Sequence, residues 1–151
     1  MPKLELTSPA FNDGEKIPEK YGYTEENANP PLKIKDVPNG TQSLVLIMDD
    51  PDAKEPAGKV WDHWIVYNIE PNTSFIYEDS VPPGSKEGKN DYGRNQYGGP
   101  NPPDREHTYM FKLYALDTTL NLKSGVSKKE EQDAMEGHIL EETLLTGTYA
   151  P

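Results

Sequence analysis

The pattern of apolar and polar positions predicts three main strands. A continuous apolar run over residues 44–48 is typical of a strand that is buried on both faces. A second strand is predicted over residues 64–69 and a third over residues 109–116, where apolar and polar positions partly alternate. The composition of residues 1–42 favours short strands and turns, because Gly, Pro and Asn occur at intervals along this segment and interrupt regular structure. The pattern therefore indicates a β protein with long connections.

The C-terminal part has a helical period instead. Ser127 and Glu130 have the spacing of a capping box, in which each side chain binds a backbone N–H at the start of a helix. Apolar residues then recur at helical spacing: Met135, Ile139, Leu140 and Leu144. Gly147 is a suitable stop. We therefore expect one C-terminal amphipathic helix over residues 128–145, packed against a mostly β domain.

Composition agrees with a single domain over residues 1–151, which is long enough for a real core. A hydrophobic content of 33%, with 15 Pro and 12 Gly, suits a loop-rich β protein better than a helical bundle. The absence of Cys excludes disulfides, thiol catalysis and thiolate metal sites. No apolar run reaches the roughly 18 residues of a spanning helix, and the first residues lack an apolar signal core. We therefore expect a cytoplasmic protein that is not integral to a membrane.

The formal net charge of -11 limits the choice of partners. So acidic a chain offers nothing to neutralise phosphates in series, which argues against nucleic acid. It argues equally against a polybasic contact with a membrane surface. A small molecule or another protein is therefore the expected partner. The oligomeric state stays open, with a homodimer among the alternatives.

Strand alternation brings four polar side chains into one hypothesis. Residues two apart share a face of a strand. Asp50 ends the apolar track of the first strand, His63 begins that of the second (the track 61–69), and His107 with Tyr109 begins that of the third. If the first two strands pair antiparallel and the third runs parallel to the second, all four side chains meet at one pole. The expected result is a small pocket with an apolar floor.

The chemistry of such a pocket is anion binding. A carboxylate such as Asp50 favours the charged form of a neighbouring imidazole and raises its pKa. Two imidazoles and a phenol then offer several N–H and O–H donors to phosphate or carboxylate oxygens. We therefore predict weak oxyanion binding that strengthens as the pH falls towards 6. Each of these residues taken alone is more often structural, and only their combination favours a site.

Other chemistries have less support. His63, His107 and Asp50 lack the tight spacing of a metal site, and no Gly-x-Ser-x-Gly elbow is present. Asp50 and Asp52 stand too close together to hold a sugar between them as a glycosidase would. We therefore expect no enzyme activity, no catalytic residues, no metal and no cofactor.

The sequence resembles the phosphatidylethanolamine-binding protein family in its small bacterial and archaeal form, over nearly the whole chain. The motifs that carry the resemblance are Asn29-Pro30-Pro31-Leu32, Asp50-Pro51-Asp52-Ala53, Trp61-x-His63-Trp64, Tyr97-Gly98-Gly99-Pro100-x-Pro102-Pro103, His107-x-Tyr109 and Leu113-Tyr114-Ala115-Leu116-Asp117. It implies a mostly β fold of two sheets with Greek-key character and short peripheral helices. It also implies an anion-binding pocket built from Asp50, Trp61, His63, Pro103, His107 and Tyr109.

The resemblance also implies two classes of function. Members of the family bind phosphate-type head groups, and some inhibit kinases or serine proteases; none is an established enzyme. We therefore expect a phosphate-ester binding protein, with a protease- or kinase-inhibiting interaction module as the alternative. Two positions depart from the family pattern: Lys54 stands where a proline is usual, and Thr108 stands where arginine is common.

A long segment over residues 79–106 supplies the remaining expectation. Loops of this length within a compact domain are often functional. We expect residues 98–103 to form an ordered wall of the pocket, since Gly98-Gly99 permits a reversal with positive φ and the three prolines that follow stiffen the chain. The alternative is a mobile segment that closes only on a ligand or engages a protein partner.

Overall fold

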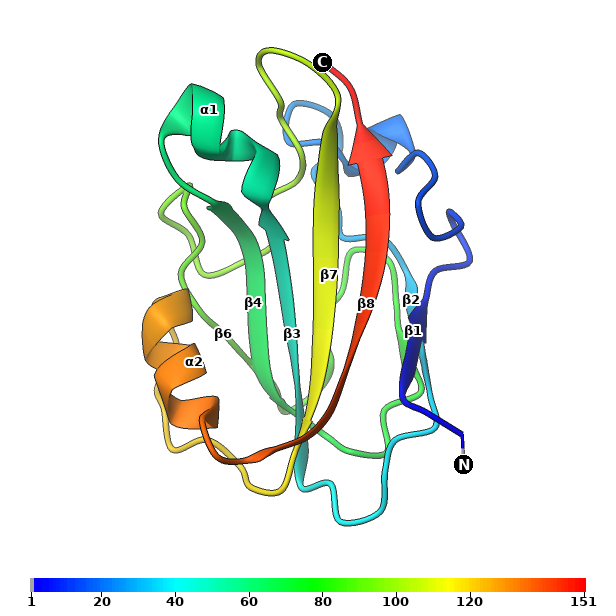
Figure 1. Cartoon of the computed structure of the whole chain (residues 1–151), viewed down its shortest axis with the longest axis vertical. Helices are drawn as coiled ribbons and strands as arrows, with labels where there is room; N and C mark the ends of the chain where they lie inside the picture. Colours follow the sequence, from blue (N-terminus) through cyan, green and yellow to red (C-terminus); the bar gives the residue numbers. More distant parts are fainter. Residues whose placement is uncertain (1) are drawn as a thin grey trace.

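The protein folds as two β-sheets with short helices at their periphery (Figure 1). The computed structural model describes residues 2–151. The smaller sheet has the strand order β1-β2-β5, with β1 Glu5–Thr7, β2 Leu32–Lys35 and β5 Phe75–Ile76. The larger sheet has the order β6-β4-β3-β7-β8, with β3 Ser43–Asp50, β4 Trp61–Ile69, β6 Lys86–Glu87, β7 His107–Leu116 and β8 Ile139–Tyr149. The helical segments are η1 Glu19–Tyr21, η2 Pro51–Ala53, α1 Lys54–Ala57 and α2 Lys128–Met135.

Strand β3 is the centre of the larger sheet. All of its residues are buried, which confirms the strand with two buried faces that the apolar run predicts. It pairs antiparallel with both β4 and β7. The end of β3 and the beginnings of its two neighbours therefore lie at the same pole of the sheet, which is the arrangement that the pocket hypothesis requires.

The two faces of the larger sheet are covered differently. One face packs against the smaller sheet and the N-terminal segment, where Leu46, Phe111 and Leu113 join Leu32 in the main hydrophobic cluster. The opposite face carries Val45, Ile47, Ile65 and Tyr67, and there Met135 of α2 joins them in a second cluster. Figure 1 shows α2 beside β4 and β6 on this face. Burial of each of these large apolar side chains contributes about 1.5–3 kcal/mol to folding.

The predicted helix over residues 128–145 is wrong in its second half. The capping box of Ser127 and Glu130 is present, but α2 ends at Met135. Gly137 adopts a φ of +84°, which stops the helix, and residues 139–149 form β8 on the edge of the larger sheet. Ile139, Leu140 and Leu144 are each more than two-fifths exposed. The apolar spacing that suggests a helical face therefore belongs partly to a strand with an open outer surface.

Strand β4 departs from simple alternation. Met48 pairs with Trp64 and Asp49 pairs with Asp62, so His63 is an extra residue in the ladder, a β-bulge. A second irregularity lies between Val66 and Ile69. The single track 61–69 is therefore wrong: Trp64 and Val66 face the main cluster, while Ile65 and Tyr67 face α2.

Candidate functional site

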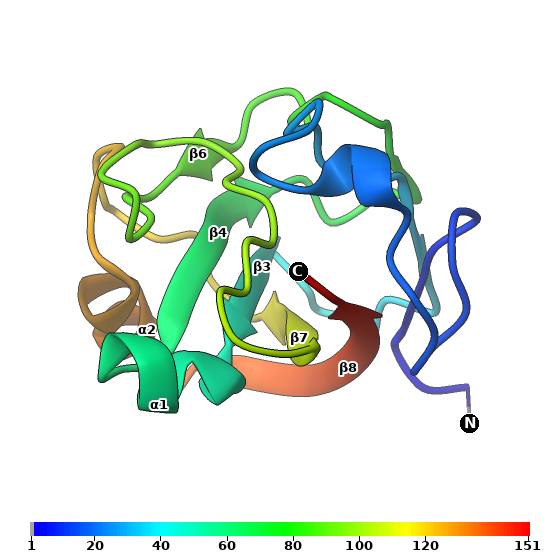
Figure 2. The same cartoon turned by 90° about the horizontal axis from the view of Figure 1, so that it is seen from above.

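A pocket of about 200 Å³ lies at the pole where β3 ends and where β4 and β7 begin. Figure 2 looks down on this pole, where α1 and the loop before β7 lie beside the strand ends. All six residues of the sequence-based site line the pocket: Asp50, Trp61, His63, Pro103, His107 and Tyr109. The other lining residues are Ala53, Pro56, Ala57, Tyr92, Asn101 and Pro102. Strand ends thus supply the polar groups, while α1 and the loop supply much of the apolar wall.

Asp50 and His107 form the buried polar base of the pocket. Asp50 is the last residue of β3, and its Oδ1 accepts a hydrogen bond of 2.9 Å from the Asp52 backbone N–H at the start of η2. Its Oδ2 lies 2.6 Å from Nδ1 of His107. Both side chains are almost fully buried. The turn after β3 therefore fixes the carboxylate, and the carboxylate fixes the imidazole ring.

His107 meets a second carboxylate at its other nitrogen. Nε2 lies 2.8 Å from Oδ1 of Asp104, in the loop that precedes β7. Burial alone would lower the pKa of His107, but the hydrogen bonds to Asp50 and Asp104 outweigh it and raise that pKa. The ring is therefore held as an imidazolium that donates to a carboxylate on each side.

His63 is in the opposite state. Its ring is buried, and Nδ1 donates to the Gly98 carbonyl oxygen at 2.7 Å, because a carbonyl can only accept. Burial lowers the pKa of His63 to about 4. The ring is therefore neutral at physiological pH, and its Nε2 is an acceptor. The expectation of two protonated imidazoles near pH 6 does not hold for this residue.

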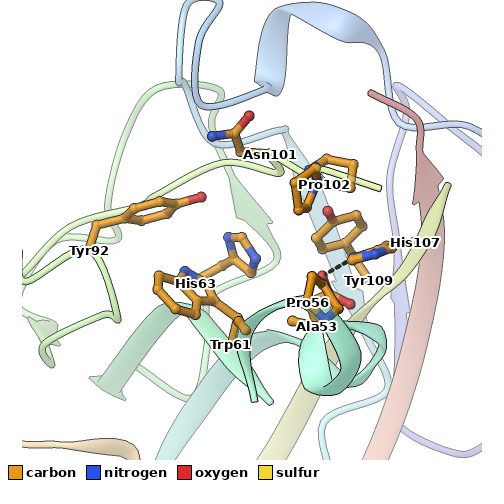
Figure 3. A pocket seen from close by; sticks show the side chains of 12 residues that line it. Ala53, Pro56, Trp61, His63, Tyr92, Asn101, Pro102, His107 and Tyr109 are labelled. Carbon is orange, nitrogen blue, oxygen red and sulfur yellow. Dashed lines mark hydrogen bonds and ion pairs between the residues drawn. The ribbon is translucent and has the colours of Figure 1, made fainter. Parts of the chain in front are cut away.

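Two buried donors of the pocket have no hydrogen-bond partner within the described residues 2–151. They are the indole Nε1–H of Trp61 and the hydroxyl of Tyr109. In Figure 3 Trp61 and His63, both from β4, lie beside Tyr109 of β7. A buried polar group without a partner costs about 1–3 kcal/mol, and such groups in a native pocket often mark the place of a ligand or water.

The wall opposite the strands is formed by residues 101–103 and by Tyr92, and residues 98–100 lie directly before it in the chain. Gly98 and Gly99 do not adopt positive φ, so the predicted reason for these glycines is wrong. They are needed for close approach: a Cβ on Gly98 would lie 2.4 Å from the Tyr92 ring, and one on Gly99 would lie 2.1 Å from the backbone oxygen of Tyr21. The segment nevertheless lines the pocket as expected, through Asn101, Pro102 and Pro103.

Tyr92 is the functional candidate that the sequence does not reveal. It belongs to no motif, yet its ring stacks on Tyr23 with 3.9 Å between centroids and meets Trp61 edge-on. Its hydroxyl donates to the Gly99 carbonyl oxygen at 2.9 Å. The available signal is only that the segment holding it is long and rich in Gly and Pro.

The other acidic residues of the Asp49–Asp52 cluster serve the scaffold. Asp49 points to the opposite face of β3, where its Oδ2 accepts from Lys112 at 3.0 Å and from Lys128 at 3.2 Å. Asp52 accepts from the Thr108 backbone N–H at 2.9 Å. Among residues 2–151, no group of three or more acidic or histidine side chains is arranged to hold a metal ion. Nor is any helix there long and apolar enough to cross a membrane.

Comparisons with known proteins agree with this geometry. The family model described as phosphatidylethanolamine-binding protein matches residues 7–150. A UPF0098 protein of Methanothermobacter thermautotrophicus is 46% identical over 97% of this chain and 98% of its own length. A UPF0098 protein of Chlamydia trachomatis is 42% identical over 97% of this chain and 98% of its own length.

Solved structures show the same architecture. A putative phosphatidylethanolamine-binding protein homolog from Chlamydia trachomatis superposes with a TM-score of 0.92 at 42% identity, covering 97% of each chain. YbcL of Escherichia coli, described as a member of the mammalian family, superposes with a TM-score of 0.90 at 29% identity and covers 98% of each chain. The similarity therefore extends over the whole two-sheet domain, including the pole that carries the pocket.

Proposed function

Because the chain belongs to the phosphatidylethanolamine-binding protein family, we propose that its pocket binds the oxyanion head group of a small phosphate-type ligand. The observation that carries the proposal is a pair of buried donors that have no partner among residues 2–151, Trp61 Nε1–H and the Tyr109 hydroxyl, beside a buried imidazolium. Oxyanions accept several hydrogen bonds at once and are bound most strongly by charged donors. The two donors without a partner, with the charge of the His107 ring beside them, match the oxygens of a phosphate group.

The apolar part of the lining favours a phosphate ester over the free ion. Ala53, Pro56 and Ala57 form a wall without polar side chains, and Trp61 with Tyr92 adds two aromatic faces. A substituent on the phosphate would bury apolar surface there, which contributes about 25 cal/mol per Å². We therefore propose a ligand with an anionic head and a small apolar or amphipathic substituent.

The two tryptophans supply an internal control for the binding experiment. Trp61 lies in the pocket with a free N–H, whereas Trp64 donates its indole N–H to Glu87 at 2.8 Å, outside the pocket. In ¹H–¹⁵N spectra, titration with phosphoethanolamine is expected to shift the Trp61 indole signal and to leave the Trp64 signal in place. Tyr109→Phe is expected to weaken the binding, because it removes one donor without changing the ring.

Ethanolamine without the phosphate tests the assignment of the head group. We expect no binding of this cation alone at concentrations that saturate the phosphate ester. Preferential binding of ethanolamine, or an equal shift of both indole signals, would contradict an oxyanion site.

The inhibitor alternative is tested with the same protein. Residues 98 and 99 are held against the pocket by hydrogen bonds from the Gly98 N–H to the His63 carbonyl and from the Gly99 N–H to the Asn27 side chain. A segment held in this way supports a role as the pocket wall more than a role as an inhibitory loop. Inhibition in a panel of serine proteases and kinases, unaffected by Tyr109→Phe, would favour the protein-interaction module instead.

A further inference from the structure

Two carboxylates contact His107, and they differ in how firmly they are held. The Asp50 side chain is 4% exposed and is fixed by the start of η2, whereas the Asp104 side chain is 36% exposed and belongs to a loop. Asp104 nevertheless lies 2.8 Å from Nε2 of His107. One nitrogen of the ring is therefore bound permanently to the scaffold, and the other is bound to a group that can leave.

We propose that Asp104 sets the ligand selectivity of the pocket, because its carboxylate occupies the His107 Nε2–H that a bound oxyanion would otherwise take. This inference rests on the proposed function. His107 lines the pocket, but both of its N–H groups already donate within the protein. A ligand reaches this donor only by displacing Asp104.

The surroundings of Asp104 allow that exchange. Arg105 Nε lies 4.0 Å from Asp104 Oδ2, and its guanidinium also lies 3.8 Å from Asp52 and 3.8 Å from Glu55. The arginine side chain is 48% exposed. If a ligand displaces the Asp104 carboxylate from His107, water and the Arg105 guanidinium can solvate its charge, so that the charge is not buried in an apolar environment.

The internal competitor implies a preference for phosphate over carboxylate ligands. Asp104 is only three residues from His107, and a tethered group of this kind acts at an effective concentration of about millimolar or higher. A free carboxylate such as acetate has the same acceptor chemistry and no advantage over the tethered one. A phosphate group has further oxygens for Trp61 Nε1–H and the Tyr109 hydroxyl, so it gains bonds that the Asp104 carboxylate does not make.

The test compares Asp104→Asn with Glu106→Gln. Both changes remove one negative charge from the same exposed loop, but no contact joins the Glu106 side chain to His107. Calorimetric titrations with inorganic phosphate and with acetate are expected to show about tenfold tighter phosphate binding in Asp104→Asn. They are also expected to show acetate binding that the wild type lacks. Glu106→Gln is expected to stay within about twofold of the wild type, as a loss of general charge would do.

A ligand-free measurement tests the contact itself. In an NMR titration of the imidazole signals, Asp104→Asn is expected to lower the pKa of His107, because one of its two charged partners is gone. An unchanged pKa would overturn the inference, since the contact would then not exist in solution.

The failures of the two proposals are distinguishable. If the wild type binds phosphate and Asp104→Asn binds it no more tightly than Glu106→Gln, Asp104 is not a competitor while the binding function stands. Acetate that binds the wild type as tightly as phosphate would have the same meaning. If neither the wild type nor Asp104→Asn binds phosphate or phosphoethanolamine, the proposed function itself fails.

Discussion

Replacing Glu131 with glutamine should stabilise the protein at alkaline pH. Glu131 lies in the first turn of α2, one turn before Met135, and its side chain is fully buried on the sheet side of the helix. Neither carboxyl oxygen has a hydrogen-bond partner within the described residues 2–151. Burial therefore raises the pKa of Glu131 from its ordinary value of 4.5 to about 8.

The sign and size of the effect follow from linkage. A carboxyl whose pKa is raised by folding binds its proton more tightly in the folded state, so stability is full below about pH 4.5 and falls as the pH rises towards 8. At about 1.4 kcal/mol per pKa unit, the whole shift corresponds to about 5 kcal/mol, of which about 3 kcal/mol falls between pH 5 and pH 8. Glutamine keeps the shape of the neutral acid and does not ionise.

The assay is urea unfolding of the wild type and of Glu131→Gln at pH 5 and at pH 8. The stability of the variant relative to the wild type is expected to rise by about 3 kcal/mol between the two pH values. Other titrating groups cancel in this difference. Glu136→Gln, which changes an exposed residue just after the same helix, is the control and is expected to show no such rise. A difference for Glu131→Gln that does not change with pH would refute the buried, protonated carboxyl.

Three further predictions concern the pocket and its wall. Long-range ¹H–¹⁵N spectra should show that the His63 ring stays neutral, with its proton on Nδ1, down to about pH 5. Any gain of sulfate affinity on acidification should therefore come from protonation of His107. Loss of that gain in His63→Ala but not in His107→Ala would contradict this. Gly99→Ala should lower the free energy of unfolding by about 1–3 kcal/mol in urea titrations, because its Cβ would lie 2.1 Å from the Tyr21 backbone oxygen. An unchanged unfolding midpoint would show that the segment moves to accommodate the methyl group without loss of stability. We expect no turnover of p-nitrophenyl phosphate, since no motif of the chain positions an activated nucleophile; steady release that is abolished by His63→Ala would overturn that expectation.

The apolar runs predicted the central strands well, because a strand buried on both faces has a simple signature. Strands β3, β4 and β7 all contain the segments expected from their composition. The antiparallel arrangement places Asp50 beside Trp61, and it places His107 at the same pole of the sheet. The convergence of the polar residues was accessible for the same reason. For Asp50, His107 and Tyr109 it depends only on strand ends and on pairing direction, whereas His63 reaches the pocket through the β-bulge.

The C-terminal helix was predicted wrongly because short apolar spacings are ambiguous. Ile139, Leu140 and Leu144 fit a helical face, but a residue with positive φ at Gly137 and a free position beside β7 favour a strand. Local propensity is a weak prior that tertiary pairing overrides. Side-chain direction along β4 failed for a related reason, since a β-bulge has no composition signature.

The electrostatic states of the pocket could not be predicted from spacing. His63 and His107 have the same expected chemistry in the sequence, yet one is neutral against a carbonyl and the other is charged between two carboxylates. The difference comes largely from the Gly98 carbonyl, which lies 35 residues from His63 along the chain, and from Asp50, which lies 57 residues from His107. Tyr92 was missed in the same way, because only the closed loop brings it to Trp61.

The extra residue in β4 also shifts the alternation of inward and outward side chains, so that the two parts of the strand on either side of it alternate independently. On one side of His63 the alternation serves the hydrophobic core, and on the other side it serves the pocket. A one-residue deletion at His63 would close the ladder. Asp62 would stay opposite Asp49 on the outer face, where Lys128 contacts both carboxylates, and the pairs from Met48–Trp64 towards Leu44–Ile69 would be unchanged, so the pocket would lose only the His63 side chain. Insertions, deletions or substitutions at this pole can therefore change the pocket lining, while the side chains that pack the two sheets together keep their positions.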